Sequence, residues 1–96
     1  MRPSRVLEMK RSAVREVVSR FRTVNPRVFG SALHGTDEEG SDLDLLVDAL
    51  PGATLFDLGD LQVELESLLG IHVDVLTPPD LPIKFRAKVL AEAQPI

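Results

Sequence analysis

The fold can be inferred from two neighbouring stretches, Gly-Ser-Ala-Leu-His-Gly at residues 30–35 and Ser-Asp-Leu-Asp-Leu-Leu-Val at residues 41–47. The two apolar residues before the first stretch, Val28 and Phe29, predict a very short strand. The first stretch itself predicts one helical turn, and the polar residues 36–41 predict a loop. A short strand, a turn and a second strand are therefore expected to follow one another.

Residues 42–48 predict that second strand, because acidic and apolar side chains alternate along them. Successive side chains of a strand point to opposite faces, so Leu43 and Leu45 share an inner face, while Asp42 and Asp44 share the outer one. Two neighbouring carboxylates repel each other and raise each other's pKa, which is costly unless a cation neutralises them. The outer face is therefore a candidate cation site.

Two longer helices are expected on either side of these strands. Apolar side chains recur at helical spacing from Ser4 to Phe21. Thr54 and Asp57 have the spacing of a capping box, which predicts the start of a second long helix. Gly70 is expected to end that helix, because glycine readily adopts the left-handed conformation of a helix C-terminus.

The C-terminal part predicts a third strand and a last helix. Residues 71–76, Ile-His-Val-Asp-Val-Leu, alternate strictly. Asp74 and His72 then face away from the core. A hydrogen bond from His72 that supports the acidic site is open, but we interpret His72 as a solvated residue at the strand edge. After two prolines, Asp80 is expected to cap a helix that includes residues 83–91.

This order of elements predicts an α/β (α+β) fold in a single domain, residues 1–96. We expect a small mixed sheet of three to four strands, with helices on one face and an open acidic face. The chain has no cysteine, which excludes disulfides and thiolate metal sites. No apolar run is long enough to span a membrane, so we expect a cytoplasmic protein that is not bound to a membrane.

Charge is distributed unevenly along the chain. Residues 1–27 carry eight Lys or Arg against two Glu, whereas residues 28–96 carry three Lys or Arg against thirteen acids. A basic end can dock an acidic partner or a nucleic acid. The acidic remainder argues against a broad nucleic-acid surface.

Asp74 adds a third carboxylate to the pair at Asp42 and Asp44 if the two strands are neighbours. Carboxylate ligands completed by substrate phosphates are typical of Mg²⁺. Such a cluster can hold two ions, and Asp74 could also accept the proton of an attacking hydroxyl. Gly30 and Ser31 lie between a strand and a helical turn, where backbone N–H groups and a hydroxyl can bind phosphate.

The combined pattern resembles the signature of the DNA polymerase β-like nucleotidyltransferase superfamily, and the chain's small size points to its minimal nucleotidyltransferase branch. The resemblance implies the nucleotidyltransferase fold, with Asp42, Asp44 and Asp74 as catalytic metal ligands and Gly30 and Ser31 as triphosphate contacts. It also implies ATP as substrate and Mg²⁺ as cofactor. Members of this branch are often antitoxins of HEPN-domain ribonuclease toxins, and some adenylylate the toxin on tyrosine.

The leading hypothesis is therefore a Mg²⁺-dependent nucleotidyltransferase that adds AMP to a tyrosine of a HEPN toxin. The chain contains no tyrosine, so a tyrosine acceptor must lie in another protein. Two alternatives stay open: an antitoxin that neutralises its toxin by contact alone, and a nucleotidyltransferase acting on RNA. Whether the chain forms homo-oligomers is also left open. Many family members have Arg where this chain has His34, which leaves a phosphate contact by His34 undecided.

Overall fold

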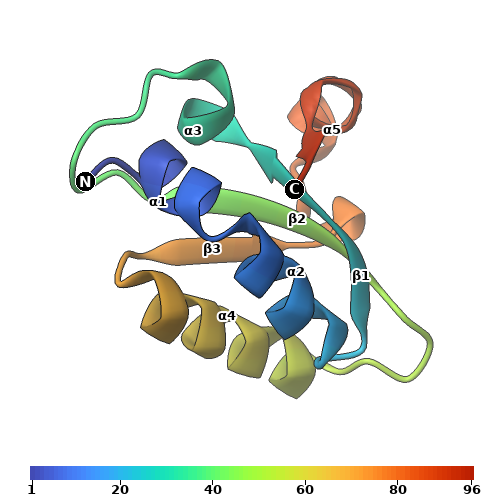
Figure 1. Cartoon of the computed structure of the whole chain (residues 1–96). Helices are drawn as coiled ribbons and strands as arrows, with labels where there is room; N and C mark the ends of the chain where they lie inside the picture. The colour runs from blue at the N-terminus through green and yellow to red at the C-terminus, as the bar shows by residue number, and fades with distance from the viewer.

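A computed structural model describes residues 1–96, in which six helical segments surround one four-stranded sheet (Figure 1). The helices are α1 (Pro3–Met9), α2 (Arg11–Ser19), α3 (Gly30–His34), α4 (Leu55–Leu69), the short 3-10 helix η1 (Pro78–Asp80) and α5 (Ile83–Glu92). The strands are β1 (Thr23–Phe29), β2 (Leu43–Ala49), β3 (Val73–Leu76) and β4 (Gln94–Pro95). The sheet order is β3-β2-β1-β4; β2 and β3 are parallel, and β1 is antiparallel to β2 and β4.

The hydrophobic core lies between the sheet and helices α1, α2 and α4, which cover the face turned towards the viewer in Figure 1. As the alternation predicts, this face of the sheet carries Val28, Leu43, Leu45, Val47 and Val73, all buried. The helices contribute the remaining buried side chains: Leu7, Val14, Val17, Val18, Leu61, Leu65 and Leu69. The helical layer thereby fixes which side chains of β2 and β3 must point the other way.

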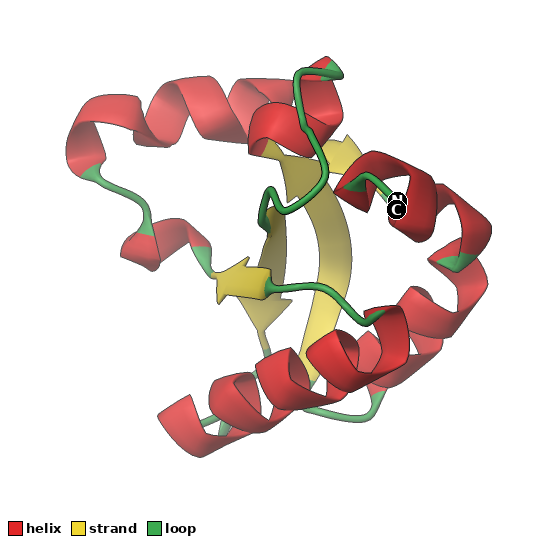
Figure 2. Cartoon of the chain, turned by 90° about the vertical axis from the view of Figure 1, so that its left-hand side faces the viewer, coloured by secondary structure: helices red, strands yellow, loops and turns green.

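The opposite face of the sheet is covered only at one end. Leu46 is fully buried although it lies outside the main core cluster, and Leu81, which links η1 to α5, is buried as well. Figure 2, a side view, shows helices on both sides of the sheet: α1, α2 and α4 lie on one face as expected, but η1 and α5 lie on the other, contrary to the expectation. The end of this face that carries Asp42, Asp44 and Asp74 stays accessible, so the expected open acidic face is present.

Two details in the N-terminal part differ from the sequence expectations. The first helix is divided, because Lys10 leaves helical geometry (φ −129°, ψ 25°) between α1 and α2. Strand β1 is longer than Val28 and Phe29 alone and runs through Pro26. A β-bulge between Val24 and Arg27 accommodates that proline, since proline has no N–H to donate to the ladder.

The remaining differences lie at the C-terminal end. Asp80 does not cap the last helix; its carboxylate accepts hydrogen bonds from the backbone and the hydroxyl of Thr77 and so closes η1. Strand β4 has only two residues, too few for any sequence pattern. The predicted capping box at Thr54 and Asp57 is confirmed, as is the end of α4 at Gly70. None of the helices is both long and apolar enough to cross a lipid bilayer.

Candidate active site

The acidic site is built by the pairing of the two parallel strands. Asp44 on β2 and Asp74 on β3 are register partners, so their side chains leave the same face of the sheet. Asp42 stands directly before β2 and is exposed, whereas Asp44 and Asp74 are half-buried. The three carboxylates that the sequence analysis selected from two separate strands therefore share one end of the open face.

Gly30 brings the backbone of α3 against this cluster. Phe29 is the register partner of Asp44 across β1 and β2, so the chain turns into α3 beside the Asp44 carboxylate. Gly30 has a left-handed conformation (φ 72°), and a Cβ atom there would overlap the Asp44 carboxylate. The start of α3 has no side-chain cap, so its N–H groups and the Ser31 hydroxyl remain available to a ligand.

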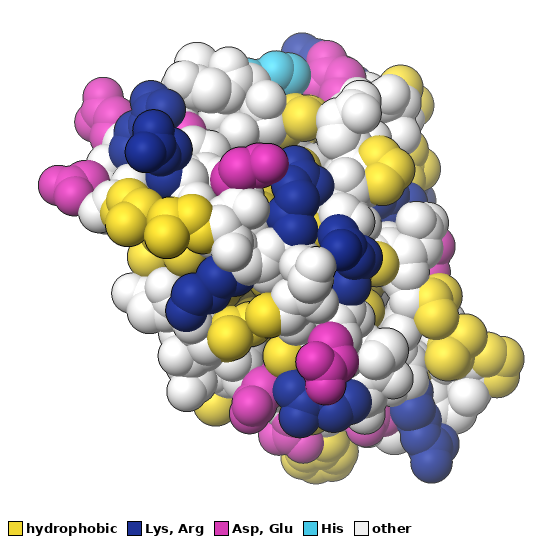
Figure 3. Space-filling view, viewed as in Figure 1, with side chains coloured by type: hydrophobic (Ala, Val, Ile, Leu, Met, Phe, Trp, Pro, Cys, Tyr) yellow, Lys and Arg dark blue, Asp and Glu magenta, His cyan; other side chains and the backbone are white.

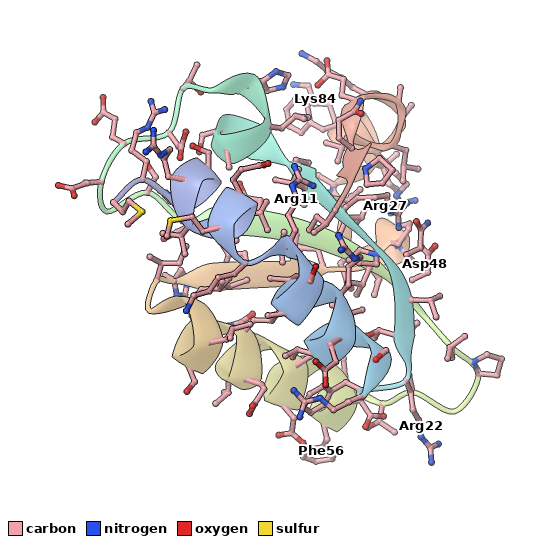
Figure 4. The ribbon with its side chains drawn as sticks, viewed as in Figure 1. Arg11, Arg22, Arg27, Asp48, Phe56 and Lys84 are labelled. Atoms are coloured by element: carbon pink, nitrogen blue, oxygen red, sulfur yellow. The ribbon has the colours of Figure 1, made fainter.

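The site is electrostatically unfavourable without a cation. Burial, the charges of Asp74 and Asp42 and a hydrogen bond with Asp74 together raise the pKa of Asp44 to about 6. Asp48, further along β2, is no part of this cluster. Its carboxylate pairs with Arg27 at 2.7 Å and accepts a hydrogen bond from Asn25 (Figure 4). No Lys or Arg side chain pairs with Asp42, Asp44 or Asp74, and only His72 reaches this cluster, so negative charge is concentrated there.

His72 is a member of the cluster that the sequence interpretation underrated. Its ring is half-exposed, as a strand-edge residue should be, but it is also paired: Nδ1 lies 2.6 Å from Glu66 and Nε2 lies 3.3 Å from Asp74. Desolvation opposes the charged form, yet the carboxylates of Asp42, Asp74 and Glu66 raise the pKa of His72. The sequence indicated a place for His72 beside the cluster, because it lies two residues before Asp74. No sequence pattern indicated that Glu66 on α4 would pair with His72.

The donor groups fit a divalent cation. Asp42, His72 and Asp74 each offer a ligand atom, and these atoms lie within 4.8 Å of one another. Asp44 adds a further carboxylate beside Asp74. Carboxylate oxygens and one imidazole suit hard or borderline ions, and a bound cation would favour the ionised form of Asp44, which burial and the neighbouring carboxylates disfavour.

Comparison with known proteins agrees with this geometry. The family model described as "Nucleotidyltransferase domain" matches residues 10–96. The chain belongs to the nucleotidyltransferase family. A solved structure described as a "putative minimal nucleotidyltransferase" superimposes with a TM-score of 0.86 at 42% identity, covering 97% of this chain and 95% of that one. The protein is accordingly an enzyme of the minimal nucleotidyltransferase branch.

Two further similarities concern relatives of this nucleotidyltransferase. Protein adenylyltransferase MntA of Thermococcus cleftensis is 36% identical over 78 residues, which are 81% of this chain and 79% of the relative. A crystal structure described as a toxin-antitoxin with AMP-PNP superimposes with a TM-score of 0.70 at 21% identity, covering 83% of this chain and 66% of that one. The second similarity establishes the shared fold alone.

Proposed function

We propose that this nucleotidyltransferase transfers AMP from ATP to a hydroxyl group of a separate protein, with Mg²⁺ as its cofactor. The observation that carries the proposal is the convergence of Asp42, Asp44 and Asp74 beside the Gly30–Ser31 turn. A carboxylate cluster and a phosphate-binding turn are the two parts that a metal–triphosphate substrate requires.

Each part of the site has a proposed task. Asp42, Asp44 and Asp74 would hold the divalent ions, two in number, which would supply charge stabilisation for the triphosphate when bound. Gly30 and Ser31 bind phosphate oxygens through backbone N–H groups and the serine hydroxyl. Asp74 takes the proton of the acceptor hydroxyl as that oxygen attacks the α-phosphorus, the bond to the bridging oxygen breaks, and pyrophosphate leaves.

A protein acceptor is supported by the relatives and by the chain itself. One relative is named a protein adenylyltransferase, and one structural neighbour is described as a toxin-antitoxin with AMP-PNP. We propose that the partner is a HEPN-domain toxin and that its acceptor is a tyrosine. Because this chain has no tyrosine, transfer to tyrosine must occur between two proteins.

The test is to incubate the purified pair with Mg²⁺ and ATP labelled with ³²P at either the α- or the γ-phosphate. Adenylylation predicts that the partner is labelled from α-labelled ATP only, and that Asp44→Asn abolishes the label. Label from the γ-phosphate would indicate phosphoryl transfer and contradict the proposal. Full neutralisation of the toxin by Asp44→Asn, without any label, would favour an antitoxin acting by contact.

A further inference from the structure

A cavity of about 370 Å³ opens beside the acidic cluster, between the end of β1 and helix α5. This volume falls in the range of small-molecule sites, roughly 300–1,000 Å³. The apolar part of its wall consists of Phe29, Leu76, Leu81, Phe85 and Val89. No residue of α5 is fully buried, so this helix presents its apolar side chains to the cavity and to solvent instead of completing a core.

The cavity adjoins the proposed phosphate site at Gly30. Gly30 lines the cavity and also contacts the Asp44 carboxylate, while Phe29 in the cavity wall is the register partner of Asp44. A ligand whose phosphates lie at Gly30 would therefore extend into this cavity without crossing any other element.

The polar groups of the cavity come from the two helices on either side of it. His34 on α3 and Glu92 on α5 face each other at 3.2 Å between Nε2 and Oε2. Lys88 on α5 adds a positive charge to the lining. An apolar wall with two aromatic rings, joined to a few polar groups and one cation, suits a flat heterocycle attached to a sugar and phosphates.

We propose that this cavity binds the base and ribose of the nucleoside triphosphate, with the base against Phe29 and the apolar side chains of α5. This inference rests on the proposed function, because it places the rest of the same substrate. Phe29, Phe85 and Val89 are then substrate-positioning residues that the carboxylate motif does not include.

The test measures binding of two ligands in Mg²⁺: ATP, and inorganic tripolyphosphate, which has the phosphates without a nucleoside. Val89→Phe narrows the cavity, and Ile83→Phe makes a similar change on the same helix at a side chain that is 85% exposed and outside the cavity lining. Phe85→Ala removes one aromatic ring at a half-exposed position outside the hydrophobic core.

We expect Val89→Phe and Phe85→Ala each to weaken ATP binding at least tenfold and to leave tripolyphosphate binding and the melting temperature unchanged. Ile83→Phe should leave the binding of both ligands unchanged. Equal losses for ATP and tripolyphosphate would show that the cavity holds phosphates and overturn the proposal. Unchanged ATP binding in both cavity variants would also overturn it. If these variants bind ATP normally and lose only transfer to the partner, the cavity holds the acceptor and the proposal is overturned as well.

Asp44→Asn separates this inference from the proposed function. If Asp44→Asn abolishes binding of both ligands while the cavity variants bind ATP normally, the metal site stands and the nucleoside lies elsewhere. If Asp44→Asn binds ATP as the wild type does, the proposed function itself fails.

Discussion

Gly30 and Asp44 lie so close together that residue 30 has no room for a side chain. The backbone that begins α3 therefore rests against one of the carboxylates proposed to hold the metal. This contact joins the turn proposed to bind phosphate to the acidic cluster in a single structure, although the two are separated in sequence by the loop at residues 36–41.

Gly30→Ala is expected to abolish ATP binding, because the methyl group would displace the Asp44 carboxylate. Gly70→Ala is the matched control: Gly70 has nearly the same left-handed conformation (φ 69° against 72°) but no atom near its Cβ position. Both variants should lose about 1 kcal/mol of stability through backbone strain, and Gly30→Ala should lose more. Thermal unfolding and calorimetric titration with ATP measure the two effects. Normal ATP binding by Gly30→Ala would contradict the close contact.

Removing charge from the acidic cluster is expected to stabilise the metal-free protein. Asp42→Asn together with Asp44→Asn relieves repulsion at residues that the fold does not use, so the melting temperature in a chelator should stay equal or rise, while nucleotide transfer is lost. Asp48→Asn is the contrasting variant on the same strand, because it weakens the ion pair with Arg27 and should lower the melting temperature. A clear loss of stability in the double variant would mean that Asp42 and Asp44 are structural.

The raised pKa of Asp44 predicts how metal-free stability depends on pH. Between its ordinary value and about 6, folded Asp44 binds a proton that the unfolded chain has released. The contribution of this group to the free energy of unfolding therefore falls as pH rises through that interval. Asp44→Asn should flatten the slope between about pH 4 and pH 6 in chelator-treated samples. An identical slope in wild type and variant would exclude Asp44 as its source.

The basic surface of α2 is expected to contact the partner protein. Figure 3 shows Lys and Arg side chains spread over the face formed by α1 and α2. Arg11 is partly engaged within the chain, with Glu8 at 2.9 Å and with the carbonyl of Pro95, whereas Arg15 and Arg20 are exposed.

Charge reversal at Arg15 and Arg20 should therefore weaken partner binding, more at low salt than at high salt. Lys84→Glu on α5 serves as the comparison from a different face. Binding assays at several salt concentrations provide the measurement. If only Lys84→Glu weakens the complex, the interface lies on α5.

The layered fold could be predicted from sequence because its signals are local. The alternation in β2 and β3, the helical spacing of the first helix and the capping box of α4 each specify an element without reference to the rest of the chain. The shared face of Asp44 and Asp74 follows once β2 and β3 are neighbours, since a one-residue shift would turn apolar side chains such as Leu43 or Val73 out of the core. Their direct pairing does not follow, because a two-residue slip would keep the same faces.

The features that sequence could not predict depend on contacts between distant segments. The length of β1 was missed because Pro26 normally interrupts a strand, and only the bulge beside it permits pairing. Glu66 lies in the last turn of α4 and pairs with His72, which follows the end of that helix. No sequence pattern predicts this contact. The cavity beside Gly30 needs α5 to lie over β1, which the pattern of α5 does not specify.

We propose that Asp42, Asp44 and Asp74 form a site for a divalent cation and a nucleoside triphosphate. Calorimetric titration of the chelator-treated protein with ATP, in the presence and absence of Mg²⁺ or Mn²⁺, tests it most directly. We expect ATP binding only when the divalent ion is present. Equal ATP affinity with and without the ion would contradict it.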